Sequence, residues 1–246
     1  MCPQLLDEAR QEDDLTAARP VPAAKVSLTF YAKWGKRALD IFCSSLGLLV
    51  LSPLFVVVAY CIKLTSPGPS FYLQTRIGRN GRQFLIVKFR SMIIGKLNGD
   101  LGITVSGDKR VTPIGRVLRR YKLDELPQLW NVLRGDMSLV GPRPELPMYV
   151  ASYTAEQRQV LAVRPGITDP ASLTYRHEEK ILAEYDDPDQ FYRTRILPDK
   201  LAQSLVYLQK ISLKVDLRII VETALSLFFP RSRAQVQSHF KQNDGI

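Results

Sequence analysis

Two adjacent acids, Asp124 and Glu125, lie within a strongly basic part of the chain. From Lys63 to Arg143 there are fifteen Lys or Arg residues and only five Asp or Glu residues. The 246-residue chain as a whole carries a formal charge of +10. Such a surplus favours anionic partners, for example phosphate groups or acidic lipid headgroups. Charge alone also allows nucleic acid.

The acidic pair has an ordinary structural explanation. Pro127 is tolerated in a first helical turn, so Asp124 can act as a helix N-cap. A phosphorylated substrate changes the balance, because a phosphate at about 4 Å from a carboxylate costs on the order of 4 kcal/mol per charge pair at an effective dielectric of 20. Such a site needs cations. Mg²⁺, held by carboxylates and substrate phosphates, and nearby Lys and Arg side chains would supply them.

The elements that would position these cations can be predicted from local patterns. Residues 69–90 are predicted to form a β-hairpin, because two apolar, β-prone runs flank an Asn-Gly turn. At the end of its second strand, Lys88 and Arg90 would share one face and present paired charge to an anion. Solvated edge-strand charges are the alternative. Arg143 has proline on both sides, which fixes the backbone around it.

Several helices are predicted around the acidic pair. Residues 113–122 combine an apolar stripe with a basic face, a pattern typical of a helix lying on an anionic membrane. A surface helix of a soluble domain would look the same. Further helices are predicted at about 126–133, 198–212 and 216–229, and the segment 164–179 is predicted to be an ordered loop.

An apolar segment precedes all of these elements. Residues 41–62 contain no charge, and a length of about 20 residues suffices to cross a bilayer. Basic residues flank both ends, so the positive-inside rule places both on the cytoplasmic side. Pro53 at the midpoint would bend the helix, and Ser52 would hydrogen-bond a freed carbonyl. A re-entrant hairpin satisfies both features; a kinked single span and a buried core helix are the alternatives.

These elements predict an α+β fold: a small helix-rich cytoplasmic domain with a β-hairpin, anchored by the re-entrant hairpin and by interfacial amphipathic helices. Asp40, at the edge of the apolar segment, is expected to pair with Lys36 and Arg37 or to be solvated. The predicted divisions are a disordered cytoplasmic tail (1–30), a re-entrant membrane helix broken at Ser52-Pro53 (31–66), a catalytic domain (67–230) and a polar tail (231–246).

Six motifs occur in a recognisable order: KRALDIF, LLVLSPLF, TSPGPSFY, RIGRNGRQFLIVKFRSM, VTPIGRVLRRYKLDELPQLWNVLRGDMSLVGPRPE and PGIT. In order and spacing they resemble the monotopic bacterial phosphoglycosyl transferases, or initiating sugar transferases, over about residues 33–227. The resemblance implies transfer of a sugar phosphate from a nucleotide diphosphate sugar, such as a UDP-sugar, to polyprenol (undecaprenyl) phosphate. UMP would be released at the cytoplasmic face of the bacterial inner membrane.

The same resemblance assigns roles to the site residues. Asp124 would be the nucleophile that forms an aspartyl-phosphosugar intermediate, and Glu125 would bind Mg²⁺. Lys88, Arg90 and Arg143 become candidates for contacting phosphate oxygens. The expected partners are the nucleotide-sugar donor, the polyprenol phosphate acceptor and the membrane, and not nucleic acid. A homodimer is compatible with the sequence.

The chain departs from the family pattern after PGIT, where it continues DPASLTYRHEEK, so the residues 169–179 receive no role in sugar binding. Two other classes of function stay open. A non-catalytic membrane scaffold that binds acidic lipid or nucleic acid would explain the charge but not the acidic pair. A phosphohydrolase would use the same aspartyl-phosphate strategy and pass the intermediate to water.

Overall fold

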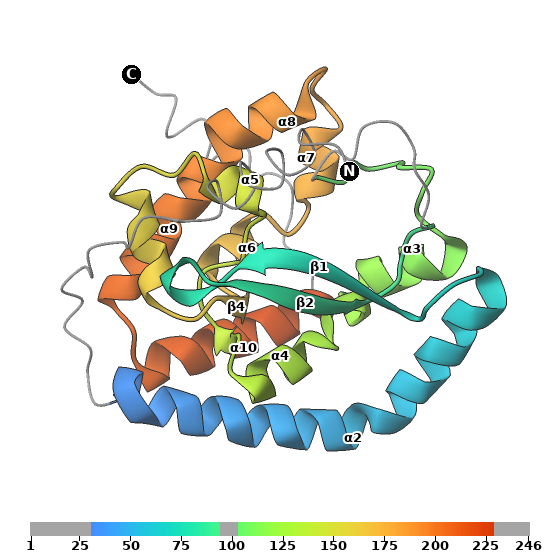
Figure 1. The fold of residues 1–246 in the computed structure, drawn as a ribbon, viewed down its shortest axis with the longest axis horizontal. Helices are drawn as coiled ribbons and strands as arrows, with labels where there is room; N and C mark the ends of the chain where they lie inside the picture. Colours follow the sequence, from blue (N-terminus) through green and yellow to red (C-terminus); the bar gives the residue numbers. More distant parts are fainter. Residues whose placement is uncertain (1–30, 94–102, 229–246) are drawn as a thin grey trace, which may run out of the picture.

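The computed structural model describes residues 31–93 and 103–228. It combines many short helices with two small sheets, which confirms the predicted α+β class (Figure 1). The α-helices are α2 (Lys36–Thr65), α3 (Pro113–Arg120), α4 (Gln128–Arg134), α5 (Pro147–Val150), α6 (Pro170–Thr174), α7 (Glu178–Leu182), α8 (Pro188–Phe191), α9 (Leu197–Gln209) and α10 (Leu213–Phe228). The strands are β1 (Phe71–Ile77), β2 (Gln83–Phe89), β3 (Ser138–Val140) and β4 (Gly166–Thr168). Shorter helical turns are η1 (Tyr31–Gly35), η2 (Arg79–Gly81), η3 (Leu123–Glu125), η4 (Gln157–Ala162) and η5 (Tyr192–Ile196). The two predicted tails, 1–30 and 231–246, lie outside the described residues.

Helix α2 runs along one side of the molecule and bends near its midpoint (Figure 1). The bend reflects Pro53, which lacks the N–H that would bond the carbonyl of Leu49 four residues earlier. The hydroxyl of Ser52 donates to that carbonyl at 2.8 Å, as predicted. The helix remains continuous from Lys36 to Thr65, so the predicted break takes the form of a bend.

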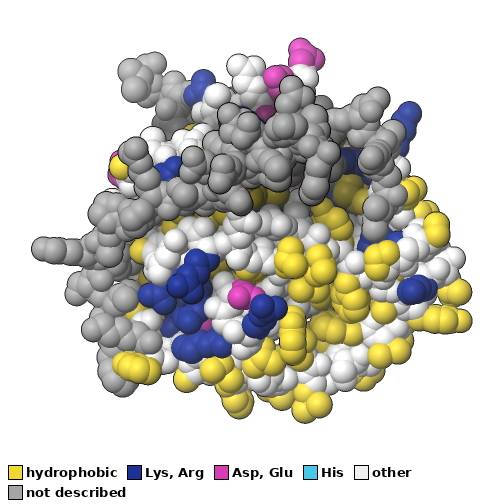
Figure 2. Space-filling view, viewed as in Figure 1, with side chains coloured by type: hydrophobic (Ala, Val, Ile, Leu, Met, Phe, Trp, Pro, Cys, Tyr) yellow, Lys and Arg dark blue, Asp and Glu magenta, His cyan; other side chains and the backbone are white. Residues whose placement is uncertain are grey.

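Most of the apolar surface of α2 is exposed. By length and composition it is the one helix in the described part of the chain that could cross a membrane, yet only 11% of its most apolar stretch is buried. In Figure 2 hydrophobic side chains line the edge of the molecule that α2 forms in Figure 1. Exposed members include Phe42, Leu46, Leu49, Val50, Val56, Val57, Tyr60 and Leu64. This exposure argues against a buried core helix.

Polar contacts attach the start of α2 to the rest of the molecule. Asp40 accepts hydrogen bonds from the Ser138 hydroxyl (3.0 Å) and from the backbone N–H of Leu139 (2.9 Å). Lys36 forms an ion pair with Asp216 of α10 at 2.5 Å. The expectation that Asp40 pairs with cations of its own helix, or is solvated, is therefore wrong. Donors on β3 bond the buried Asp40, and the buried acceptor Asp216 on α10 takes Lys36.

Apolar contacts attach the end of α2 to the same folded body. Val58 and Ile62 are buried in one cluster with Phe89 of β2 and Leu118 of α3. The Ser70 hydroxyl donates to the carbonyl of Ala59 at 2.9 Å. Both ends of α2 therefore pack on one body, and near Gly47 the helix also lies against Leu129 of α4.

The predicted hairpin is confirmed. Strands β1 and β2 pair antiparallel, and Asn80 and Gly81 in the turn have φ values of 57° and 78°. Gly adopts this left-handed region without steric cost, and Asn tolerates it. The side-chain amide of Asn131 in α4 then completes the edge of β2, accepting from the N–H of Val87 (3.0 Å) and donating to the carbonyl of Leu85 (2.7 Å).

The remaining helix predictions agree with the structure except in one segment. Helices α3, α4, α9 and α10 lie where the pattern placed them, with ends shifted by about two residues or a little more, as is common. The prediction of a loop over 164–179 is wrong, because this segment holds β4, α6 and the start of α7. Asp169 accepts from the N–H of Ser172 at 2.7 Å and so caps α6. Asp169 followed by Pro170 is a helix-start signal that the loop interpretation overlooked.

Candidate active site

The acidic pair lies in η3, the tight turn between α3 and α4. Lys122 precedes it with a left-handed φ of 56°, which redirects the chain at the end of α3. Leu123 packs against the apolar cluster at the end of α2, and η3 also contacts β2. Asp124 and Glu125 are each 8% exposed. The interpretation of Asp124 as an N-cap is wrong, because α4 begins after Pro127 without a side-chain cap.

Glu125 is paired with two cations. Its Oε1 lies 3.0 Å from Lys88 Nζ, and both carboxylate oxygens accept from the guanidinium of Arg143, at 2.5 and 3.3 Å. Burial alone would raise the pKa of Glu125, but the charges of Arg143 and Lys88 outweigh it and hold the pKa well below the usual range. Glu125 is therefore ionised at neutral pH.

Asp124 has the opposite environment. Its Oδ1 atom is buried and has no hydrogen-bond partner among the described residues. Burial raises the pKa of Asp124, and the negative charge of Glu125 raises it further. A buried polar atom without a partner costs about 1–3 kcal/mol, so such atoms are rare in folded proteins and call for an explanation. Adjacent carboxyl groups whose pKa values are pushed apart are a mark of functional sites.

Of the predicted phosphate-binding residues, the structure brings Lys88 and Arg143 to the pair, but not Arg90. The guanidinium of Arg90 donates to the carbonyls of Pro67 (2.5 Å) and Ser66 (2.7 Å), and the residue is 2% exposed. It holds the connection between α2 and β1. A side chain at Gly68, where φ is 115°, would collide with this guanidinium. In this structure Lys88 and Arg90 therefore bond different partners and do not present paired charge to one anion.

A second ion pair, between Arg76 and Glu145, fixes the chain that follows Arg143, and the sequence analysis did not predict it. The carboxylate of Glu145 is buried, accepts from the hydroxyl of Tyr192 at 2.8 Å and lies 3.7 Å from Arg76. Arg76 also donates to the carbonyl of Pro144 at 3.0 Å. These contacts fix the backbone on the C-terminal side of Arg143. The sequence pointed to this region only through its Pro-Arg-Pro-Glu run. The partners of Glu145, Arg76 and Tyr192, are distant from it in the sequence.

The donor set limits how a metal could bind. In the ranges 31–93 and 103–228, no group of three or more His, Cys, Asp or Glu side chains could hold an ion by itself. Mg²⁺ at phosphoryl-transfer sites needs only one or two carboxylates together with substrate phosphates. Asp124 Oδ1 lacks a donor, and Glu125 Oε2 has one long contact. These residues fit a metal shared with a phosphorylated substrate, and not a cage made by protein alone.

A buried, unpaired carboxylate, an adjacent cation-paired carboxylate and an exposed apolar helix together form a site suited to group transfer beside a membrane. Residues 31–230 match the family described as "Bacterial sugar transferase", and the chain belongs to this family. This confirms the family that the ordered motifs predicted.

Three relatives illustrate the match. The chain is 39% identical over 211 residues to the UDP-glucose:undecaprenyl-phosphate glucose-1-phosphate transferase of Caulobacter vibrioides, covering 85% of this chain and 73% of the relative. It is 41% identical over 198 residues to the exopolysaccharide production protein PSS of Rhizobium leguminosarum, covering 78% and 94%. It is 39% identical over 193 residues to the UDP-N-acetylgalactosamine-undecaprenyl-phosphate N-acetylgalactosaminephosphotransferase of Aeromonas hydrophila, covering 76% of this chain but only 42% of that relative.

Proposed function

We propose that the protein transfers a sugar phosphate from a UDP-sugar to undecaprenyl phosphate and releases UMP. Family membership supports this, as do the names of the Caulobacter and Aeromonas relatives. Those names share the acceptor but differ in the sugar, so the proposal extends to the acceptor and leaves the sugar open. The observation that carries the proposal is the buried, unpaired Oδ1 of Asp124 beside the cation-paired Glu125.

In the first step, an oxygen of the ionised Asp124 attacks the phosphorus that carries the sugar. A P–O bond to Asp124 forms, the pyrophosphate P–O bond breaks, and UMP leaves with the electron pair. Burial makes the carboxylate more basic than an exposed aspartate, which favours its attack once it is deprotonated. Lys88 and Arg143 can exchange their bonds to Glu125 for bonds to phosphate oxygens, which lowers the charge repulsion.

In the second step, a phosphate oxygen of undecaprenyl phosphate attacks the same phosphorus. The bond to Asp124 breaks, a new pyrophosphate forms, and the carboxylate is restored. The sequence of two displacements predicts ping-pong kinetics. A covalent intermediate also explains why the nucleophile is kept without hydrogen bonds, since a fully bonded carboxylate would first have to lose those bonds.

We further propose that Glu125 holds Mg²⁺ together with pyrophosphate oxygens. When bound, the ion supplies positive charge that stabilises the phosphate oxygens as the P–O bonds change. Glu125 is suited to this role because Arg143 and Lys88 keep it ionised at neutral pH. Lys88 and Arg143 would then be released to hold substrate.

The membrane arrangement that suits this reaction is a re-entrant α2 on the cytoplasmic face of the bacterial inner membrane. Two observations support it: the apolar face of α2 is exposed, and both ends of the helix pack on one folded body. Leu123 packs against the apolar cluster that includes Val58 and Ile62 at the end of α2, so the acidic pair would lie near the headgroup layer, where the acceptor phosphate is found. Labelling Lys33 and Lys63 from the cytoplasmic side tests this; accessibility from opposite sides of the membrane would contradict it.

The function is tested by incubating the full chain in nanodiscs with Mg²⁺, undecaprenyl phosphate and a panel of UDP-sugars while UMP release is measured. We expect release with at least one donor, none from Asp124→Asn, and normal release from the control Asp136→Asn, whose side chain lies at the end of α4 beside Arg134. Exchange of labelled UMP into the donor without acceptor tests the covalent step.

The other outcomes separate the rival functions. Release that is equally fast without acceptor, with free sugar phosphate as the product, identifies a phosphohydrolase. Absence of release with every donor, together with salt-dependent binding to anionic vesicles, identifies a scaffold.

A further inference from the structure

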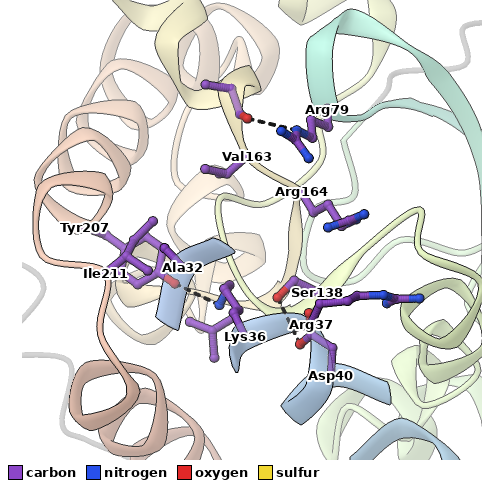
Figure 3. Close-up of a pocket in the computed structure, with 12 residues that line it drawn as sticks. Ala32, Lys36, Arg37, Asp40, Arg79, Ser138, Val163, Arg164, Tyr207 and Ile211 are labelled. Atoms are coloured by element: carbon purple, nitrogen blue, oxygen red, sulfur yellow. Dashed lines mark hydrogen bonds between the residues drawn. The ribbon is translucent and has the colours of Figure 1, made fainter. Parts of the chain in front are cut away.

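A second group of cations surrounds a cavity of about 60 Å³ at the start of α2 (Figure 3). Its walls come from η1 and α2, the hairpin tip, the chain before β4, and α9. Lys36, Arg37, Arg79 and Arg164 line it, and Asp40 is the only acid among the described lining residues. A single water needs only about 10–15 Å³, so the cavity has room for a larger polar group.

Two of the four cations are already engaged. Lys36 is paired with Asp216 at 2.5 Å. Arg37 donates to the carbonyls of Val132 (2.6 Å) and Leu133 (2.9 Å), near the C-terminal end of α4. Cations are favourable there because the last carbonyls of a helix are unpaired. Arg37 nevertheless lines the cavity.

The other two cations keep most of their donors unused. Arg79, at the exposed hairpin tip, uses its Nε to donate to the carbonyl of Ala162 at 3.1 Å. Arg164 uses its Nε to donate to the carbonyl of Gly135 at 2.8 Å. The terminal nitrogens of both side chains make no hydrogen bond within the described ranges, and in Figure 3 they lie on the same side of the cavity as the guanidinium of Arg37.

The three guanidinium groups are close enough to repel one another. Burial lowers the pKa of Arg164, and the charges of Arg37 and Arg79 lower it further. Asp40 offsets this only in part, and its Oδ1 already accepts from Ser138 and from the backbone N–H of Leu139. An anion placed among the three arginines would relieve the repulsion.

This cavity is separate from the acidic pair. Arg79 lies at the tip of the hairpin, whereas Lys88 lies near the far end of β2, roughly 17 Å away along the strand at about 3.3 Å per residue. None of the residues that contact Glu125 lines the cavity. The cavity adjoins the first turn of α2, where that helix would enter the headgroup layer.

We propose that the arginine cavity binds a phosphate group independently of the acidic pair. Planar guanidinium groups match phosphate oxygens with paired hydrogen bonds, which favours phosphate over a simple counter-ion. Two sources share this chemistry: the headgroup of an anionic phospholipid and a soluble phosphate ester. The position beside α2 favours the lipid, and this preference rests on the re-entrant arrangement proposed above.

Native mass spectrometry of the full chain, released from nanodiscs of phosphatidylglycerol or phosphatidylcholine, tests the lipid arm. We expect wild type to retain phosphatidylglycerol, and Arg79→Gln and Arg164→Gln to bind it about tenfold more weakly, as expected from the loss of charge-assisted hydrogen bonds. The control Arg82→Gln removes an exposed arginine three residues from Arg79 that does not line the cavity, and it should bind as wild type does. Arg164→Lys keeps the charge and should restore part of the binding.

Inorganic phosphate provides the second arm. A rise in melting temperature on adding phosphate that disappears in Arg79→Gln but not in Arg82→Gln, without any preference for phosphatidylglycerol, supports a soluble source. Lipid retention and phosphate response that are both unchanged in Arg79→Gln and Arg164→Gln overturn the proposal. Asp124→Asn should retain lipid as wild type does, so loss of sugar transfer and loss of phosphate binding are distinguishable.

Discussion

Two buried groups of acidic side chains lie beside opposite ends of α2, and they differ in how fully their oxygens are bonded. Asp216, near the start of α2, is 1% exposed and accepts from Tyr31 (2.7 Å), Lys36 (2.5 Å) and Tyr207 (2.7 Å). Asp124, near the end of α2, is almost as buried, yet its Oδ1 has no partner among the described residues.

The difference separates a group that stabilises the fold from one that is available for chemistry. A buried carboxylate with three donors has its desolvation offset in the folded state, and removing it leaves those donors unpaired. A buried carboxylate without a donor lowers the stability of the folded state, and such sites persist where activity needs them. Four changes test this comparison.

The largest effect is expected from Asp124→Asn. Loss of a covalent nucleophile should reduce the rate of UMP release by about 10³-fold or more. The free energy of unfolding should stay the same or rise, because a neutral amide is less costly to bury next to Glu125 than a charge. Turnover and chemical denaturation of the same preparation measure the two effects. Full activity, or a marked loss of stability, would contradict the comparison.

Asp216→Ala should have the reverse profile. It leaves the charge of Lys36 and two tyrosine hydroxyls without their acceptor, and we expect the free energy of unfolding to fall by about 3 kcal/mol. The control is Glu222→Ala on the same helix, whose ion-pair partner Arg218 is largely exposed, and it should lower the free energy of unfolding much less than Asp216→Ala does. Equal effects of the two changes would show that the Asp216 network does not stabilise the fold.

Lys88→Met should change the pH dependence of turnover. Burial and Glu125 raise the pKa of Asp124, whereas the charge of Lys88 lowers it. Because the attacking form is deprotonated, the acid limb of kcat/KM should lie above the ordinary aspartate pKa of about 3.9. Removing Lys88 should move that limb to still higher pH. The exposed Lys109→Met serves as the control and should leave the limb in place.

The smallest effect on stability is expected from losing the hydrogen bond to the carbonyl of Leu49. Ser52→Ala removes the hydroxyl that bonds the carbonyl of Leu49, and we expect a loss of about 0.6 kcal/mol, the average for side-chain hydrogen bonds within membranes. Ser45→Ala on the same helix is the matched control, because Ser45 makes no hydrogen bond to a described residue. Thermal unfolding in nanodiscs measures both. Indistinguishable melting temperatures would mean that the backbone at Pro53 is satisfied in another way.

Local patterns predicted much of the fold. The hairpin followed from its Asn-Gly turn, α3 from its apolar stripe, and the bond from Ser52 from the missing N–H of Pro53. In each case the determining contacts lie within a few residues of one another. The basic surroundings and ordered motifs predicted that Lys88 and Arg143 lie at a phosphate site, but not that both pair with Glu125.

Long-range competition explains what the sequence could not reveal. Arg90 was expected to share a strand face with Lys88, but β2 ends at Phe89 and the guanidinium of Arg90 donates to the carbonyls of Ser66 and Pro67. Asp40 bonds a strand about a hundred positions away rather than its helical neighbours. A buried side chain can often reach several polar partners. The packing of distant elements decides which one it bonds, and this choice cannot be predicted from a local sequence pattern.

The attachment of both ends of α2 to one body has a consequence for how the bilayer acts on this protein. A helix that enters the membrane and returns, as proposed, adds cross-sectional area to one leaflet and none to the other. Its insertion then depends on the lateral pressure and curvature of that leaflet. Bilayer thickness, which sorts spanning helices through hydrophobic mismatch, would have little influence on it.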